Sequence, residues 1–272
     1  MPLGAYYKIW WYPEIGQGRI VKFFRKPSKG NERVFSEFDP FGEPLGNDNN
    51  VDKGDDVERF NERMSQSISR TKSRIFELAG CNPWDWFFTG TLNPEWHDTC
   101  NLEAFRKRLS QYIRDCRKKY GTPCAFLLIP EQHKSGAWHV HGLLSGFPDK
   151  AFRRFEKNEI LPHKILKEIN KGSDIRDWTG YSAKFGFTTV SLIRCQAKCT
   201  SYVTKYITKD CYKTSISNGG HMFYASQGLK GKVLAFEGKR LPLDIGKVEF
   251  GYSNDYVEIA DINKLPKSCI GE

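Results

Sequence analysis

The sequence has no apolar run that approaches the roughly 20 residues needed to span a bilayer, and its start lacks the apolar segment of a signal peptide. It contains 8 cysteines but no Cys-x-x-Cys spacing, so neither a zinc ribbon nor a disulfide framework is indicated. It also lacks the Gly-x-x-x-x-Gly-Lys-Ser/Thr loop that binds nucleotide phosphates in many ATPases. These absences favour a cytoplasmic protein with reduced thiols, no membrane partner and no ATPase of that type.

Basic side chains outnumber acidic ones. The 42 Lys and Arg residues against 32 Asp and Glu residues give a formal net charge of +10. Such an excess favours an anionic partner, and nucleic acid is the first candidate. Because 39% of the residues are hydrophobic and 14% are aromatic, the chain can also build a sizeable core.

A polar, glycine-rich stretch at about residues 39–57 is the best candidate for a domain boundary. We expect an N-terminal extension at residues 1–60 that includes this linker. The main domain is expected at residues 61–240, and a C-terminal extension at 241–272.

Hydrophobic periodicity predicts helices and strands that alternate along the chain. The expected helices are at 56–79, 101–120, 149–170 and 196–209, and the expected strands at 86–92, 124–129, 138–144 and 186–193. Strands before and after helices, with a hairpin in the middle, predict an α+β fold with a central antiparallel sheet and flanking helices.

The strand expected at 138–144 contains two histidines separated by one apolar residue. Because side chains alternate along a strand, His139 and His141 point to one face and Val140 points to the other. Two neighbouring imidazoles form half of a metal site. An isolated pair of this kind more often makes local hydrogen bonds on a polar sheet face, so a metal site requires a third ligand.

The third ligand depends on the length of the turn before this strand. A three-residue loop with Gly136 in the left-handed conformation places Glu131 opposite His139, whereas a two-residue turn directs Gln132 at the histidines. His133 is a further possible ligand, although its place in the turn favours contact with solvent. Two imidazoles and one carboxylate suit Mg²⁺ or Mn²⁺ held partly by water and substrate phosphate.

The helix expected at 196–209 carries possible nucleophiles. Residues four apart lie on one helix face, so Tyr202 and Tyr206 are neighbours, with Lys205 and Lys209 close by. A phenol is a poor nucleophile at its usual pKa of about 10. Ammonium groups and a metal-bound phosphate favour the phenolate. Tyrosines at this spacing more often pack in a core, so the hypothesis depends on their occurrence after the histidine pair on a basic chain.

These motifs resemble those of a known family. His139-Val140-His141 resembles the His-hydrophobe-His motif of the HUH endonucleases. The run from Tyr202 through Tyr206 to Lys209 resembles the two-tyrosine motif of rolling-circle replication initiators of small single-stranded DNA phages and related plasmids. The segment Phe88-Thr89-Gly90-Thr91-Leu92-Asn93-Pro94 is similar to the first motif of that family. The resemblance covers roughly residues 65–235.

The resemblance implies a ferredoxin-like or RRM-like antiparallel sheet, with the histidines on its central strands and the tyrosine helix facing them. It also implies metal-dependent, strand-specific nicking of single-stranded DNA at a replication origin, including an origin folded as a hairpin. A covalent 5′-phosphotyrosine intermediate and strand transfer would follow. Tyr206 also fits the Tyr-x-x-Lys pattern of single-tyrosine initiators and is the first candidate nucleophile, and Tyr202 is the second. Lys209 and Lys205 would bind phosphate or phenolate.

The missing phosphate loop implies that the protein depends on a helicase and a polymerase of its bacterial host cell. Two other functions fit part of the pattern. A plasmid mobilisation relaxase or a single-strand transposase uses the same chemistry, but the order of the motifs favours an initiator. A non-catalytic module would bind single strands by stacking bases on Trp84, Trp86, Phe87 and Trp138.

Overall fold

A computed structural model describes residues 5–24, 56–156, 159–208, 211–212, 221–253 and 257–269. Residues 39–55 of the expected linker lie outside this part of the chain. Among the described helices, none is both long and apolar enough to cross a membrane. The chain divides into two compact units, one made of residues 1–82 and 229–272 and the other of residues 83–228.

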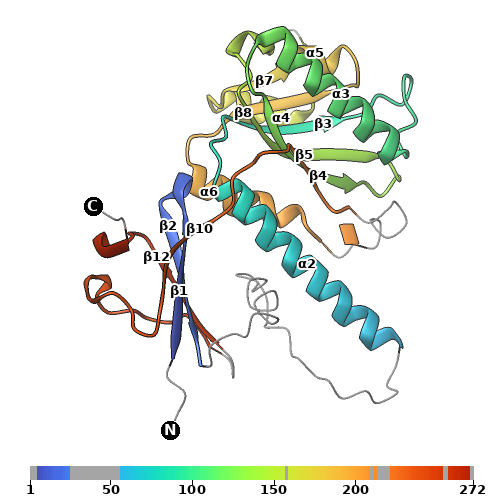
Figure 1. Cartoon of the computed structure of the whole chain (residues 1–272). Helices are drawn as coiled ribbons and strands as arrows, with labels where there is room; N and C mark the ends of the chain where they lie inside the picture. The colour runs from blue at the N-terminus through green and yellow to red at the C-terminus, as the bar shows by residue number, and fades with distance from the viewer. Residues whose placement is uncertain are drawn as a thin grey trace. The chain divides into compact units, whose positions relative to one another are not determined.

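The unit of residues 83–228 is built on one antiparallel sheet with the strand order β6-β7-β8-β3-β5-β4-β9 (Figure 1). Its strands are β3 (Trp86–Thr91), β4 (Ala125–Gln132), β5 (Trp138–Ser145), β6 (Phe152–Arg154), β7 (Ile175–Trp178), β8 (Thr188–Leu192) and β9 (Tyr224–Ala225). Its α-helices are α3 (Leu102–Tyr120), α4 (His163–Asn170), α5 (Thr179–Ser182) and α6 (Gln196–Val203).

The middle of this sheet has the order β8-β3-β5-β4, and α3 connects β3 to β4. Strand β5 therefore lies between the two strands that the helix joins, which is a split β-α-β arrangement. The predicted α+β fold with a central antiparallel sheet and flanking helices is confirmed.

Helix α3 covers one face of this sheet (Figure 1). Asn101 caps the helix by accepting a hydrogen bond from the backbone N–H of Ala104 at 3.0 Å. The buried side chains of α3 belong to the same hydrophobic core as Phe88 and Val140 of the sheet. Because strand side chains alternate, the neighbours of these residues, including both histidines of β5, point to the opposite face.

Two predicted helices are wrong in extent. The segment expected as one helix at 149–170 contains strand β6, because Phe152 pairs with the fully buried Trp178 of β7. Helix α4 begins only after Pro162. The helix expected at 196–209 ends earlier, as α6 and then the 3₁₀ turn η3 (Thr204–Tyr206). The backbone becomes extended at Ile207, whose side chain is buried.

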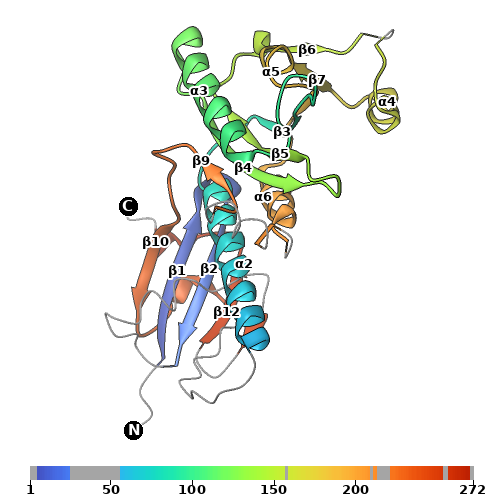
Figure 2. The same ribbon diagram turned by 90° about the vertical axis from the view of Figure 1, so that its right-hand side faces the viewer.

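The other unit contains a five-stranded antiparallel sheet with the order β10-β1-β2-β12-β11 (Figure 2). Its strands are β1 (Tyr6–Tyr12), β2 (Gln17–Phe23), β10 (Val233–Gly238), β11 (Tyr252–Ser253) and β12 (Val257–Ile262). Short 3₁₀ turns occur at Pro13–Ile15, Leu243–Ile245 and Lys267–Cys269. The two segments that the sequence predicts as separate extensions thus pair in one sheet, and the unit boundaries fall at 82/83 and 228/229 rather than at 60 and 240.

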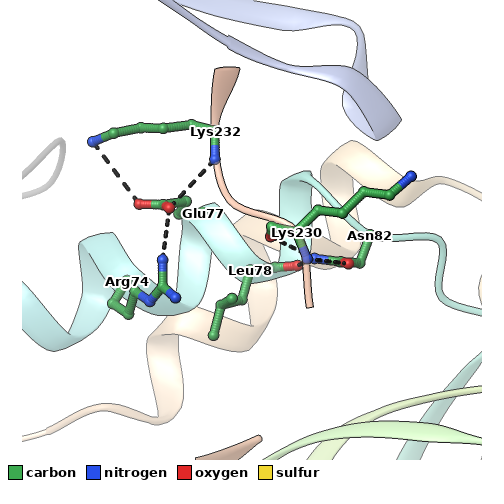
Figure 3. A network of polar contacts seen from close by, with 6 residues as sticks. All are labelled: Arg74, Glu77, Leu78, Asn82, Lys230 and Lys232. Carbon is green, nitrogen blue, oxygen red and sulfur yellow. Dashed lines mark hydrogen bonds and ion pairs between the residues drawn. The ribbon is translucent and has the colours of Figure 1, made fainter. Parts of the chain in front are cut away.

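Helix α2 (Asp56–Gly80) belongs to the same unit and matches the predicted helix. Polar contacts at its C-terminal end fix the segment that leads into β10 (Figure 3). Asn82 donates to the backbone oxygen of Lys230 at 2.9 Å and accepts from its backbone N–H at 2.8 Å. Glu77 accepts from the backbone N–H of Lys232 and from Arg74.

Candidate active site

The register of the β4–β5 hairpin gathers the predicted ligands on one face. Glu131 lies directly opposite His139, and Ile129 lies directly opposite His141. The connection is a three-residue loop in which Gly136 has a φ of +86°, in the left-handed region that glycine adopts without strain. The predicted loop and register are therefore confirmed. Gln132, the alternative ligand, instead donates to the backbone oxygen of Gly136 at 2.9 Å.

Glu131 and His141 interact directly. His141 Nε2 and Glu131 Oε2 are 2.7 Å apart, and the His141 side chain is only 12% exposed. Burial lowers the pKa of His141, while the hydrogen bond to Glu131 opposes this shift. Because the imidazole is then neutral at pH 7, its Nε2–H donates to the carboxylate and its Nδ1 is an acceptor.

Thr89 of β3 completes the hydrogen bonding of this imidazole. Its Oγ1 lies 3.1 Å from His141 Nδ1. A hydroxyl can both donate and accept, so Thr89 satisfies Nδ1 in either tautomer of the ring. If Nε2 bound a cation, Nδ1 would carry the proton and Thr89 would accept it. The side chain therefore orients His141 whether or not Nε2 keeps its proton.

His139 lies beside a third imidazole. The rings of His139 and His133 have centroids 5.3 Å apart, so His133 contacts the site although it belongs to the turn. Burial, followed by the proximity of His133, lowers the pKa of His139. A lowered pKa leaves the imidazole unprotonated at pH 7, which is the form that binds metal ions.

The donor chemistry of Glu131, His139 and His141 fits a divalent cation, because two neutral imidazoles and one carboxylate share a sheet face. The arrangement is not that of a closed metal cage. Within the described residues, no group of three or more His, Cys, Asp or Glu side chains has the geometry to hold an ion. Glu131 and His141 are instead joined by a hydrogen bond, so a cation would have to replace the proton between them.

Tyr206 lies on the histidine. Its ring is nearly parallel to that of His141, with centroids 4.0 Å apart and an interplanar angle of 15°. Phe87 of β3 packs on the same tyrosine with centroids 6.2 Å apart. The two predicted motifs, which are about 60 residues apart in the sequence, therefore meet at this contact.

Tyr202 is the neighbour of Tyr206, as predicted. The Tyr206 hydroxyl donates to the Tyr202 hydroxyl at 3.0 Å, and the Tyr202 side chain is 47% exposed. Lys205 is also present, with Nζ 5.6 Å from the centroid of the Tyr202 ring. Lys209 lies outside the described residues. The structure thus brings together Tyr202, Tyr206 and Lys205 of the predicted nucleophile set.

Tyr206 is a neutral phenol in this environment. Burial raises its pKa above the ordinary value, and the hydrogen bond to Tyr202 and the charge of Glu131 act in the same direction. A reaction through the Tyr206 phenolate would therefore need positive charge delivered to the site.

Thr89 and Phe87 have roles at this site that the sequence motifs do not reveal. Thr89 belongs to the first motif, and only the pairing of β3 with β5 shows that it lies opposite His141. The proposed base-stacking tryptophans are a second correction. Trp84, Trp86 and Trp138 are 3–5% exposed and belong to the interior, so they offer no surface to a base.

The fold and the site together define a class: an antiparallel sheet with a His-hydrophobe-His strand at its centre, faced by a pair of tyrosines. Comparison with known families supports this class. Residues 85–211 match the family model described as replication-associated protein ORF2/G2P, which covers β3 through the tyrosine pair. The suspected resemblance to rolling-circle Rep proteins is confirmed by this match. No curated protein and no solved structure matches the chain.

Proposed function

We propose that this protein initiates rolling-circle replication by nicking one DNA strand at an origin and later rejoining it through a covalent 5′-phosphotyrosine. The observation that carries the proposal is the stacking of Tyr206 on His141 at 4.0 Å. A tyrosine stacked on this histidine supports the pairing of a nucleophile with a metal ligand. The match to the replication-associated family supports the biological role.

Tyr206 is the proposed first nucleophile. The phenol gives up its proton to solvent as its oxygen attacks the phosphorus of the scissile phosphodiester, a bond from phosphorus to the tyrosine oxygen forms, and the bond from phosphorus to the 3′ oxygen breaks. The 3′ oxygen takes up a proton and leaves as a free hydroxyl. Because the phosphotyrosine keeps the bond energy, a 3′ hydroxyl can later attack it and restore a continuous strand.

Glu131, His139 and His141 are the proposed ligands of Mg²⁺ or Mn²⁺. The ion would polarise the scissile phosphate and neutralise the charge that develops during attack. Tyr202 accepts the hydrogen bond of Tyr206 and is the proposed second nucleophile. Lys205 is exposed next to it and would bind a phosphate, and we propose the same role for Lys209.

The proposed partners are single-stranded origin DNA and the helicase and polymerase of a host cell. The test is a denaturing gel of the protein incubated with Mn²⁺ and labelled single-stranded DNA that spans a candidate origin of the parent genome. Wild-type protein should give a protein–DNA adduct, and the Tyr206→Phe variant should give none.

The possible outcomes separate the functions. An adduct that survives in Tyr206→Phe and disappears in Tyr202→Phe would transfer the role of first nucleophile to Tyr202. Tight binding without any adduct, and without dependence on the metal, would identify a non-catalytic single-strand binding protein and contradict the proposal.

A further inference from the structure

We propose that Phe155 and Phe187 form a stacking site for a DNA base beside the nick site. Their rings are stacked with centroids 6.0 Å apart and an interplanar angle of 22°. The inference rests on the proposed function, because the two residues would bind a base of the same DNA strand that the active site would hold. We call the two residues the phenylalanine pair.

The phenylalanine pair lies on the sheet face that carries the histidines. The backbone oxygen of Phe187 accepts from the backbone N–H of Thr91 at 2.9 Å, and Thr91 lies directly opposite His139. Because residues that face each other in a sheet share a face, Phe187, which directly precedes β8, forms one row with Thr91 of β3 and His139 of β5. Two strand spacings separate Phe187 from His139, which is about 10 Å.

Gly186 explains why Phe187 faces outward. Phe185 is 2% exposed in the core, whereas Phe187, two residues later, is 38% exposed. Gly186 between them has a φ of +140°, and a Cβ atom there would lie 2.5 Å from the backbone nitrogen of Asn93. In a regular strand, Phe185 and Phe187 would point to the same face. The unusual backbone at Gly186 breaks the alternation, so Phe185 is buried and Phe187 faces outward.

Phe155 is held in position by a charged neighbour. The Arg153 guanidinium lies 5.7 Å from the centroid of the Phe155 ring. Arg153 in turn forms ion pairs with Glu159 at 2.6 Å and with the buried Asp177 at 3.2 Å. The ring is therefore ordered in advance, and a base that stacks on the pair would lose little of its binding energy in fixing it.

The surface between the phenylalanine pair and the active site suits a nucleic acid strand. Thr89, Thr91 and Thr189 face this side and are each partly exposed. Hydroxyl groups can contact sugar and phosphate, and an aromatic ring accepts any base because every base has a π face. The net charge of +10 favours the same partner. Continuity with the active site therefore identifies a single-stranded DNA as the occupant.

The test compares binding of two labelled oligonucleotides of equal length to the full chain, one an oligothymidine and the other an abasic strand with the same phosphates. Phe187→Ala should weaken binding to oligothymidine about tenfold, the loss of one stacked base, and should change binding to the abasic strand little. Phe155→Ala should act in the same direction, and Phe187→Trp should restore the affinity.

Leu192→Ala is the matched control. Leu192 is 49% exposed at the end of β8, the strand that directly follows Phe187, but its partner Trp86 points into the core, so Leu192 lies on the other face. Its truncation should leave both affinities unchanged. Phe187→Trp keeps an aromatic ring at this position. Recovery of oligothymidine affinity in this variant would therefore attribute the loss in Phe187→Ala to stacking and not to a general loss of folding.

Unchanged oligothymidine binding in Phe187→Ala, or an equal loss for both oligonucleotides, would overturn the stacking site and leave the proposed function intact. If the wild-type protein bound neither strand, the stacking site would be overturned, while the adduct test with origin DNA would still decide the proposed function. If Phe187→Ala lost base-dependent binding while wild type formed no tyrosine adduct, the site would stand and the nicking activity would not.

Discussion

The hydroxyl of Thr89 lies 3.1 Å from Nδ1 of His141 and connects the first sequence motif to the histidine strand. Through this contact Thr89 orients the imidazole of His141, a role that its place in the sequence does not reveal. The contact at Nδ1 keeps Nε2 directed at Glu131, because the two nitrogen atoms lie on opposite sides of the imidazole.

Replacing Thr89 with valine should weaken metal binding. Valine keeps the shape of the side chain and removes the hydroxyl that can bind Nδ1 in both tautomers. The expected loss of Mn²⁺ affinity is about 10-fold to 100-fold, as for other residues that orient metal-binding histidines. Isothermal titration calorimetry with Mn²⁺ measures it without any need for activity. Thr89→Ser should retain wild-type affinity, and an unchanged affinity in Thr89→Val would refute the positioning role.

His139→Ala and His141→Ala should each abolish cleavage of origin DNA and spare most of the binding. In the proposed mechanism both imidazoles hold the metal ion that cleavage requires, whereas binding would be spread over phosphate and base contacts. Denaturing gels and fluorescence anisotropy measure the two properties. His163→Ala, at an exposed histidine of α4, is the control and should cleave normally. Cleavage at the wild-type rate in both active-site variants would rule out their role as ligands.

Tyr202→Phe should permit a single nick and impair strand transfer. The change removes the acceptor of the Tyr206 hydroxyl, but Tyr202 is 47% exposed, so the fold should tolerate it within about 0.5 kcal/mol. A substrate with two nick sites reports both steps on one gel. Tyr120→Phe, at the end of α3, is a control for the loss of a phenol. Normal completion of both steps by Tyr202→Phe would mean that Tyr206 acts alone.

Asn82→Ala should destabilise the unit that contains both β1 and β10. The Asn82 side chain makes two hydrogen bonds to the backbone of Lys230 and one to the oxygen of Leu78, and it is 6% exposed (Figure 3). Leaving these buried groups unpaired costs about 3 kcal/mol. Urea unfolding followed by fluorescence and circular dichroism measures the loss. Asn93→Ala, which removes one exposed hydrogen bond to the Glu95 backbone, should cost less than about 1 kcal/mol. Equal stability of the two variants would contradict the prediction.

The site was predictable where local geometry determines it. Gly136 sets the length of the hairpin loop, and the loop sets the register that brings Glu131 to His139. The two-residue period of a strand then places His141 beside them. Each of these steps depends on residues that are close in the sequence.

The rest depends on contacts between distant residues. The strand at Phe152 was predicted as helix because its charged surroundings have no clear period, and its pairing partner lies at Trp178. The pairing of β1 with β10 joins segments more than 200 residues apart. Strand propensity shows that a segment can pair but does not show with which one. The phenylalanine pair was missed for the same reason, since its two members belong to different loops.

The strand order of the five-stranded sheet has a consequence for biosynthesis. Strand β2 pairs on one side with β1 and on the other with β12, so β2 lacks one neighbour until residues 257–262 have been made. The strands of the seven-stranded sheet in the described part of the chain precede residue 226. A ribosome delivers the chain from its N-terminus onward. The tyrosine-bearing unit can therefore fold during translation, while the β1–β2 hairpin waits for β12 to complete its sheet.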